Sequence, residues 1–156
     1  MAAALKKLEP SALKALSRGL TKALAETTVT TQKAQNFHWN VTGMAFGPLH
    51  ALFQEIYEDH FEGQDDLAER LRALGAHVDG RYAAYLKLSA VDESDGKLAA
   101  EKMIEALAED QETLSATMQA LAAVAEKNDD VVTNDLAINR AEKHDKFAWM
   151  LRAHLG

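Results

Sequence analysis

Apolar residues return every three, four or seven positions from about Pro10 to Gly43, which predicts one face of a long amphipathic helix. Pro10 suits the first turn of such a helix, and Gly43 is a typical stop. The threonines between positions 27 and 31 are weak helix formers, so packing against other elements must hold that part. The inner stripe consists of Leu13, Leu16, Leu20, Leu24, Thr31, Ala34 and His38.

A second helix is predicted from about Pro48 to Leu74, with Gly75 as its stop. Its main buried stripe consists of Leu49, Leu52, Phe53, Ile56, His60, Leu67, Leu71 and Leu74. A neighbouring stripe consists of His50, Gln54, Phe61, Asp65 and Glu69. A helix with two such faces is usually packed twice, once in its own bundle and once against a partner.

Two further long helices are predicted, from about Lys97 to Lys127 and from about Val131 to Leu155. Residues 75–96 contain only a short helical segment, Tyr82–Leu86, and a loop, Ser89–Gly96. A connection of this length is unusual between adjacent antiparallel helices, but a ferritin-like bundle needs one long crossover. The predicted fold is therefore all-α: a ferritin-like four-helix bundle with a long crossover containing a short helix between helices two and three. We expect a short flexible tail over residues 1–9 and a single domain over residues 10–156.

Composition narrows the classes of function. The chain of 156 residues is 47% hydrophobic and 26% charged, as expected for a domain with a real core. It has no Cys, so disulfides and thiolate metal sites are excluded. Its formal net charge of −7 favours cations as ligands and opposes DNA binding by the body of the protein. No secretion signal or membrane-spanning run is apparent, which favours the cytoplasm.

Four residues point to metal chemistry. Asp65 and Glu69 are four positions apart, so both carboxylates project from one face of the second helix. His38 and His50 flank the turn between the first two helices, and imidazoles together with carboxylates suit iron, zinc or manganese. However, His50 lies 15 residues before Asp65, roughly 22 Å along a helix, which is too far for one ion. Either the residues are unrelated, or a second, antiparallel copy brings its carboxylates to these histidines, as in a two-fold dimer with paired sites.

The bundle interior offers no alternative place for a di-iron site. Ferritin-like interiors use Glu-x-x-His on two helices, and none of the six histidines follows a Glu by three positions. We therefore expect the metal at the dimer seam. The remaining histidines at 60, 77 and 154 have ordinary structural explanations.

These motifs resemble the Dps family, the DNA-binding proteins from starved cells, also called mini-ferritins. The matching stretches are His38–Gly43 (HWNVTG), His50, Asp65–Arg70 (DDLAER) and His144–Ala153 (HDKFAWMLRA). The resemblance implies a hollow homo-dodecamer in the bacterial cytoplasm or nucleoid that oxidises Fe(II), preferentially with hydrogen peroxide, stores ferric mineral and protects DNA. It implies a di-iron centre at each two-fold interface, with His38 and His50 from one subunit and Asp65 and Glu69 from the other. Trp39 resembles a family tryptophan that intercepts oxidising equivalents.

Two further positions bear on this chemistry. The family usually has Asp or Glu four residues after the second histidine, and Gln54 stands there, which weakens the second iron position. Family members also place acidic residues around a three-fold pore, where this chain has Asp130 and Asp135. Those two carboxylates are equally well explained as helix-start residues that complement the helix dipole.

DNA binding is the alternative function. In that reading the chain is a Dps-like DNA-binding or compaction protein with weak iron chemistry, which Gln54 favours. The net charge and the shortness of the tail, whose only basic residues before Glu9 are Lys6 and Lys7, favour the ferroxidase instead, and we expect DNA binding to be weak.

Overall fold

The computed structural model describes residues 8–156, and over that range the chain forms five helices. Their bounds are α1 Pro10–Asn40, α2 Phe46–Ala73, α3 Tyr82–Leu88, α4 Ala100–Lys127 and α5 Val131–Ala153. The tail expected over residues 1–9, with Lys6 and Lys7, lies mostly outside the described residues.

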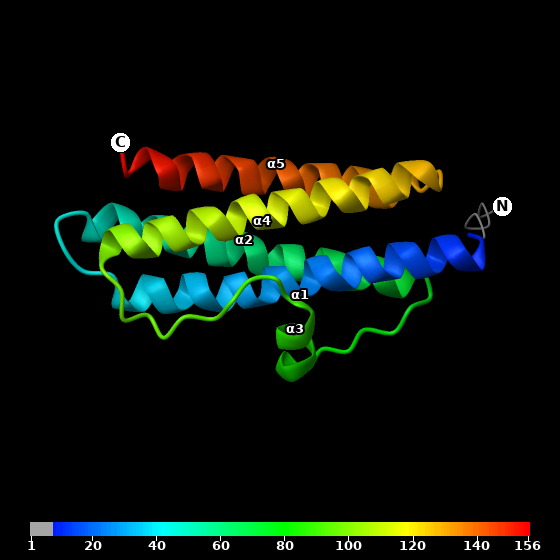
Figure 1. Ribbon diagram of the computed structural model, residues 1–156, viewed down its shortest axis with the longest axis horizontal. Helices are drawn as coiled ribbons and strands as arrows, with labels where there is room; N and C mark the ends of the chain where they lie inside the picture. The colour runs from blue at the N-terminus through cyan, green and yellow to red at the C-terminus, as the bar shows by residue number, and fades with distance from the viewer. Residues whose placement is uncertain (1–7) are drawn as a thin grey trace.

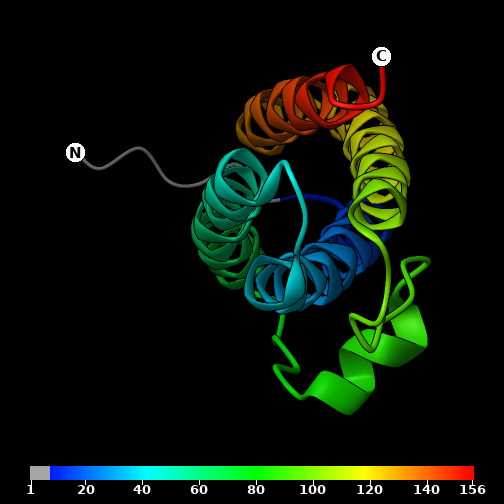
Figure 2. The same ribbon diagram turned by 90° about the vertical axis from the view of Figure 1, so that its left-hand side faces the viewer.

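The four long helices lie side by side along the long axis of the molecule, and α3 packs outside α1 (Figures 1 and 2). Helix α1 runs antiparallel to α2, and α4 antiparallel to α5. The chain between α2 and α4 returns along the whole bundle, so these two helices point the same way. The predicted all-α bundle, with a short helix in a long crossover, is confirmed.

The helix ends agree with the predictions to within three residues. Helix α1 stops at Asn40, since the backbone of Val41 is extended, and the turn to α2 then uses the positive φ of 105° at Gly43. Helix α2 begins at Phe46, earlier than predicted, since Pro48 in its first turn lacks an N–H that would be unpaired there anyway. The short helix continues two residues further, to Leu88.

Two clusters of buried side chains form the core, one towards each end of the bundle. The cluster near the α1–α2 turn contains Phe37, Leu49, Phe53, Ile56, Met103, Leu107, Phe147 and Leu151. The other contains Leu20, Leu24, Leu67, Leu71, Tyr85, Met118 and Leu121. Between them, the hydroxyls of Thr27 and Thr28 donate to the carbonyl oxygens of Ala23 and Leu24 within α1. These bonds satisfy the buried hydroxyls, and packing against the other helices keeps the threonine-rich segment helical.

None of the described helices is long and apolar enough to cross a membrane.

Candidate metal centre

His38 and His50 lie face to face across the α1–α2 turn. Their imidazole centroids are 3.7 Å apart and the ring planes differ by 15°. Nδ1 of His38 lies 2.7 Å from the carbonyl oxygen of His50, and Nδ1 of His50 lies 2.7 Å from the carbonyl oxygen of His38. A carbonyl oxygen only accepts hydrogen bonds, so each Nδ1 carries the proton. Nε2 is therefore the nitrogen that each ring can offer to a metal ion.

Aromatic rings enclose the histidine pair on both sides. Phe46 stacks on His50 with centroids 5.0 Å apart, and Tyr57 meets His38 edge-on at 5.3 Å. His38 is buried and His50 is half-buried. The pair is thus held in one orientation by its two carbonyl acceptors and by packing.

Asp65 and Glu69 are both exposed on α2, one helical turn apart. They lie beyond the reach of the histidines of the same chain, because His50 and Asp65 lie on one helix 15 positions apart, roughly 22 Å along its axis. Within residues 8–156, no group of three or more His, Asp or Glu side chains is close enough together to hold a metal ion. A single chain therefore holds the four predicted ligands as two separate groups, a pair of imidazoles and a pair of carboxylates, which we call the histidine half-site and the carboxylate half-site of the predicted centre.

Gln54 and Trp39 border the histidine half-site. The amide of Gln54 donates a 2.8 Å hydrogen bond to Oε1 of Glu58, one turn further along α2. Trp39, adjacent to His38, is 61% exposed, so its indole faces outward from the bundle.

Asp130 and Asp135 have different surroundings. Asp130 is buried at the start of α5, where its carboxylate accepts from the backbone N–H of Thr133 and forms a 2.8 Å ion pair with Arg70. This geometry agrees with the helix-start explanation of Asp130. Asp135 is exposed on the same helix.

The bundle interior contains a network of hydrogen-bonded side chains that the sequence did not reveal. Asp59 accepts from Arg140 at 2.8 Å and from Nδ1 of His60 at 3.1 Å. Nε2 of His60 accepts from the amide of Gln111 at 2.9 Å, and Oε1 of Gln111 accepts from Nδ1 of His144 at 2.8 Å. The far end, Nε2 of His144, is buried without a hydrogen-bond partner in the described part of the chain.

Burial and hydrogen bonding together decide which side chains of this network are charged. Burial lowers the pKa of His60 and, helped by the positive charge of Arg140, lowers that of His144 well below its usual value. Although burial acts against it, hydrogen bonds from His60 and Arg140 hold the pKa of the Asp59 carboxyl well below its usual range. Both histidines are therefore neutral at pH 7, and the one full ion pair is between Asp59 and Arg140.

The network explains one feature of the sequence. Gly63 lies inside a helix, where glycine costs about 1 kcal/mol relative to alanine. In the structure a Cβ at that position would come within 2.8 Å of Cζ of Arg140. The glycine is therefore needed to let the guanidinium lie across α2.

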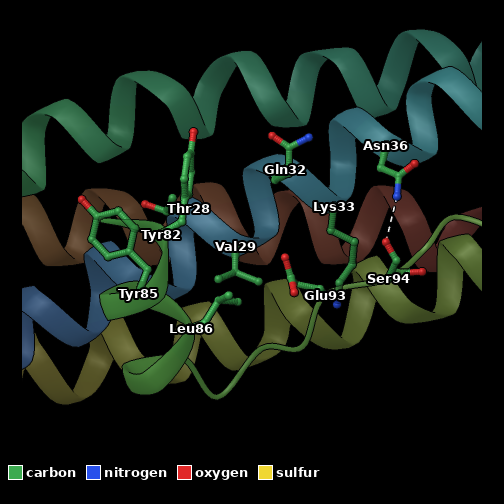
Figure 3. A pocket seen from close by; sticks show the side chains of 10 residues that line it. All are labelled: Thr28, Val29, Gln32, Lys33, Asn36, Tyr82, Tyr85, Leu86, Glu93 and Ser94. Carbon is green, nitrogen blue, oxygen red and sulfur yellow. Dashed lines mark hydrogen bonds between the residues drawn. The ribbon is translucent and has the colours of Figure 1, made fainter. Parts of the chain in front are cut away.

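A cavity of about 420 Å³ separates α1 from the crossover (Figure 3). Asn36 donates to the carbonyl oxygen of Ser94 across it, which ties the crossover to α1. Lys33 reaches from its wall to a 2.8 Å ion pair with Asp110. Burial raises the pKa of the Asp110 carboxyl to about 6, although Lys33 acts in the opposite direction. No histidine lines this cavity, so it is separate from the candidate metal centre.

Two shallower hollows flank Phe61 on the outer face of α2. One, of about 510 Å³, is lined by Tyr57, Glu58 and Phe61 together with residues of α1 and by Tyr82 of α3. The other, of about 620 Å³, includes Phe61 and Asp65. Phe61 itself is 70% exposed between them. The carboxylate half-site therefore adjoins an uncovered aromatic residue.

Comparisons with known proteins agree on one family. The ferritin-like domain family matches residues 18–156. The chain is 35% identical over 136 residues to DNA protection during starvation protein 2 of Bacillus anthracis, covering 87% of this chain and 93% of the relative. It is 36% identical over 132 residues to the DNA protection during starvation protein of Helicobacter pylori, covering 84% of this chain and 92% of that relative.

Solved structures give the same result. The Dps protein of Bacillus brevis has a TM-score of 0.91 at 30% identity, covering 96% of this chain and all of that one. The Dps protein of Vibrio cholerae O1 has a TM-score of 0.92 at 29% identity, covering 100% of this chain and 98% of that one. That protein is described as a member of a broad superfamily of ferritin-like diiron-carboxylate proteins.

Proposed function

This chain belongs to the Dps family of ferritin-like proteins, and on that premise we propose that it is a ferroxidase that also stores the iron it oxidises. Fe(II) is the substrate and hydrogen peroxide the preferred oxidant. Two Fe(II) ions each lose one electron, and the two electrons reduce one peroxide to the level of water. The ferric product is then stored as mineral inside a homo-dodecamer.

The paired orientation of His38 and His50 carries this proposal. Both Nδ1 atoms are engaged by carbonyl oxygens, so two fixed Nε2 atoms remain for metal ions. Imidazoles alone make a poor iron site, because carboxylates supply the charge that a hard cation prefers. Asp65 and Glu69 of a partner subunit supply it in an antiparallel α2 pair, which overcomes the separation along one helix.

The first test removes the carboxylates one at a time. Asp65→Ala or Glu69→Ala should abolish the fast phase of peroxide-driven Fe(II) oxidation and leave the assembly intact. Asp66→Ala is the matched control, since Asp66 is also an exposed carboxylate of α2. Wild-type oxidation rates in the Asp65 or Glu69 variants would show that the centre lies elsewhere.

Mixing two inactive variants tests whether the centre is shared. A subunit with His50→Ala keeps its carboxylates, and one with Asp65→Ala keeps its histidines, so a mixed dimer contains one complete site. Random reassembly of equal amounts should restore about a quarter of the wild-type activity, since half of the dimers are mixed and each has one site of two. No recovery after verified mixing would place all ligands on one chain.

The second candidate function is DNA binding or compaction with weak iron chemistry. The observation in its favour is Gln54, a neutral residue whose amide is bonded to Glu58. Names of the relatives refer to DNA protection, which a peroxide-consuming iron store also provides by removing the reactants that damage DNA. Comparing a gel shift at two salt concentrations with the oxidation assay separates the two functions.

A further inference from the structure

We propose that the cavity between α1 and the crossover binds a free α-amino acid that has an aromatic or large aliphatic side chain. The carboxylate of this ligand pairs with Lys33, and its ammonium group pairs with Glu93. Its side chain lies against the apolar part of the cavity. Because no predicted metal ligand lines the cavity, this proposal is independent of the ferroxidase.

The size and the walls of the cavity suit a small molecule. Its volume of about 420 Å³ falls in the range of small-molecule sites, about 300–1,000 Å³. Such sites combine a mostly apolar wall with a few polar groups that orient the ligand. Here Val29 of α1 is buried, and Tyr85 and Leu86 of α3 face it across the cavity (Figure 3). This wall accepts a side chain such as that of phenylalanine or leucine.

Charged groups of both signs line the same cavity. Lys33 is buried, and its Nζ lies 2.8 Å from Oδ2 of Asp110. An ammonium group has three N–H donors, and within residues 8–156 Asp110 is the only ion-pair partner of Lys33. Glu93 lines the cavity from the crossover and forms no ion pair over the same range. The cavity therefore offers one cation and one anion that can each take a further partner.

The positions of these charges favour a zwitterion with an apolar body. Lys33 and Glu93 lie on one side of Val29, and the rings of Tyr82 and Tyr85 lie on the other (Figure 3). Val29 and Lys33 are one turn apart on α1, roughly 6 Å along the axis, which is comparable to the separation between the ring and the carboxylate of phenylalanine. A ligand of single charge would be repelled by the group of its own sign, whereas a zwitterion satisfies both.

Three probes of nearly equal size test the assignment of charge. L-phenylalanine carries both charged groups, 3-phenylpropionate lacks the ammonium group, and phenethylamine lacks the carboxylate. Isothermal titration of the full chain should show one L-phenylalanine per chain, bound about tenfold or more tighter than either analogue, since each analogue loses a charge-assisted hydrogen bond. Equal or tighter binding of an analogue, or no binding of L-phenylalanine up to the millimolar range, would overturn the proposal.

Variants of the two charged residues test the placement of the ligand. Lys33→Met and Glu93→Gln should each weaken L-phenylalanine binding about tenfold or more. Glu93 is exposed, so Glu93→Gln keeps the fold even if the buried Lys33 proves hard to replace. Lys87→Met is the matched control, because Lys87 is an exposed lysine of α3 that does not line the cavity. Unchanged affinity in Glu93→Gln would show that the ammonium group does not lie at Glu93 and would overturn the proposal.

The shared use of Lys33 makes binding depend on pH. Burial raises the pKa of the Asp110 carboxyl to about 6, and the charged groups that act on it are Lys33, Asp92 and Glu109. Protonation of Asp110 removes the carboxylate that competes with the ligand for Lys33. The affinity for L-phenylalanine should therefore rise as the pH falls from about 7.5 to about 5.5, while the amino acid stays zwitterionic.

The variant Asp110→Asn supplies the corresponding control. Without the competing carboxylate, it should bind L-phenylalanine at pH 7.5 about as tightly as the wild type does at pH 5.5, and its affinity should not change between these values. Isothermal titration at both pH values measures this. A wild-type affinity that is the same at both pH values would show that the ligand carboxylate does not lie beside Lys33 and Asp110, and the proposed placement would be wrong.

Discussion

Nδ1 of His38 and Nδ1 of His50 each lie 2.7 Å from the backbone carbonyl oxygen of the other residue. The bond pair joins the last turn of α1 to the first turns of α2, so it fixes the corner of the bundle as well as the two rings. Replacing either histidine removes one proposed metal ligand and also leaves a carbonyl oxygen of the opposite residue without its donor. We therefore regard alanine variants of the carboxylates as cleaner probes of the chemistry than variants of the histidines.

The acidic residues at the start of α5 can be tested apart from each other. Asp130→Ala removes a helix cap and the partner of Arg70, so the free energy of unfolding should fall by about 1–3 kcal/mol. Asp135 is exposed, so Asp135→Asn should leave stability within about 0.5 kcal/mol. Urea unfolding measures both changes.

The pore prediction then depends on Asp135→Asn. If this carboxylate lines an entry route for Fe(II), the variant should take up iron more slowly in low salt while the oxidation step itself is unaltered. Stopped-flow measurements at two ionic strengths provide the comparison. Uptake that matches the wild type in low salt would leave helix-dipole complementarity as the role of Asp135.

DNA binding should be absent or strongly dependent on salt. The formal net charge of −7 repels phosphate, and the N-terminal basic residues before Glu9 are Lys6 and Lys7. Any complex should therefore be lost between about 50 and 200 mM salt, as counterion release weakens. A gel shift of the full chain and of a variant lacking residues 1–9 tests this. A complex that survives moderate salt, or whose affinity for DNA is unchanged by the deletion, would show that another surface binds DNA.

The regular parts of this fold were predictable because burial follows helical periodicity. Leu16, Leu20 and Phe53 were assigned to inner stripes and are fully buried. The interior network was not predictable, since Asp59 and Arg140 are 81 positions apart and meet only after α2 and α5 pack. Asp130 was ambiguous for a similar reason, because its partner Arg70 lies on another helix. Spacing predicted the two half-sites, which stay a prediction because a single chain does not bring them together.

Acid should destabilise the fold through the buried histidines. His60 and His144 are neutral when folded, so below pH about 6.5 the unfolded chain binds more protons and the free energy of unfolding falls as the pH falls. Asp110 acts in the opposite direction: its raised pKa of about 6 means that the folded state binds the extra proton between pH 3.8 and 6. With two histidines acting against one carboxyl, the net result of acidification below pH about 6 should be a loss of stability.

The variant Asp110→Asn separates the contribution of Asp110 to the pH dependence of stability from that of the two histidines. Removing the carboxyl removes its opposing contribution, so the loss of stability on acidification should steepen by about one proton per molecule. Urea titrations at pH 7.5, 6.0 and 5.0 measure the slope. A slope equal to that of the wild type would mean that Asp110 titrates at its ordinary value in the folded protein.

Gln54 provides the most demanding test of the metal centre. If the acid usual in the family at this position helps to hold a second iron, the amide should leave an asymmetric centre. One ion would then bind well to His50, Asp65 and Glu69, and the other only weakly. Since peroxide takes two electrons, a half-filled centre must wait for a second Fe(II) before it reacts. Gln54→Glu should therefore raise the number of ions bound per centre and lower the Fe(II) concentration that gives half the maximal rate.

In the structure, the substitution Gln54→Glu also has a destabilising effect. The amide of Gln54 donates to Glu58, and a carboxylate there would instead face Glu58 one turn away, a like-charge pair that costs about 0.2–0.5 kcal/mol on a helix. Gln54→Met is the matched control, because it loses the same hydrogen bond without adding charge. Titration with Fe(II) in the absence of oxidant decides between the effects. Two ions of similar affinity per centre in the wild type would show that Gln54 is no handicap and that both iron positions are complete without an acid at 54.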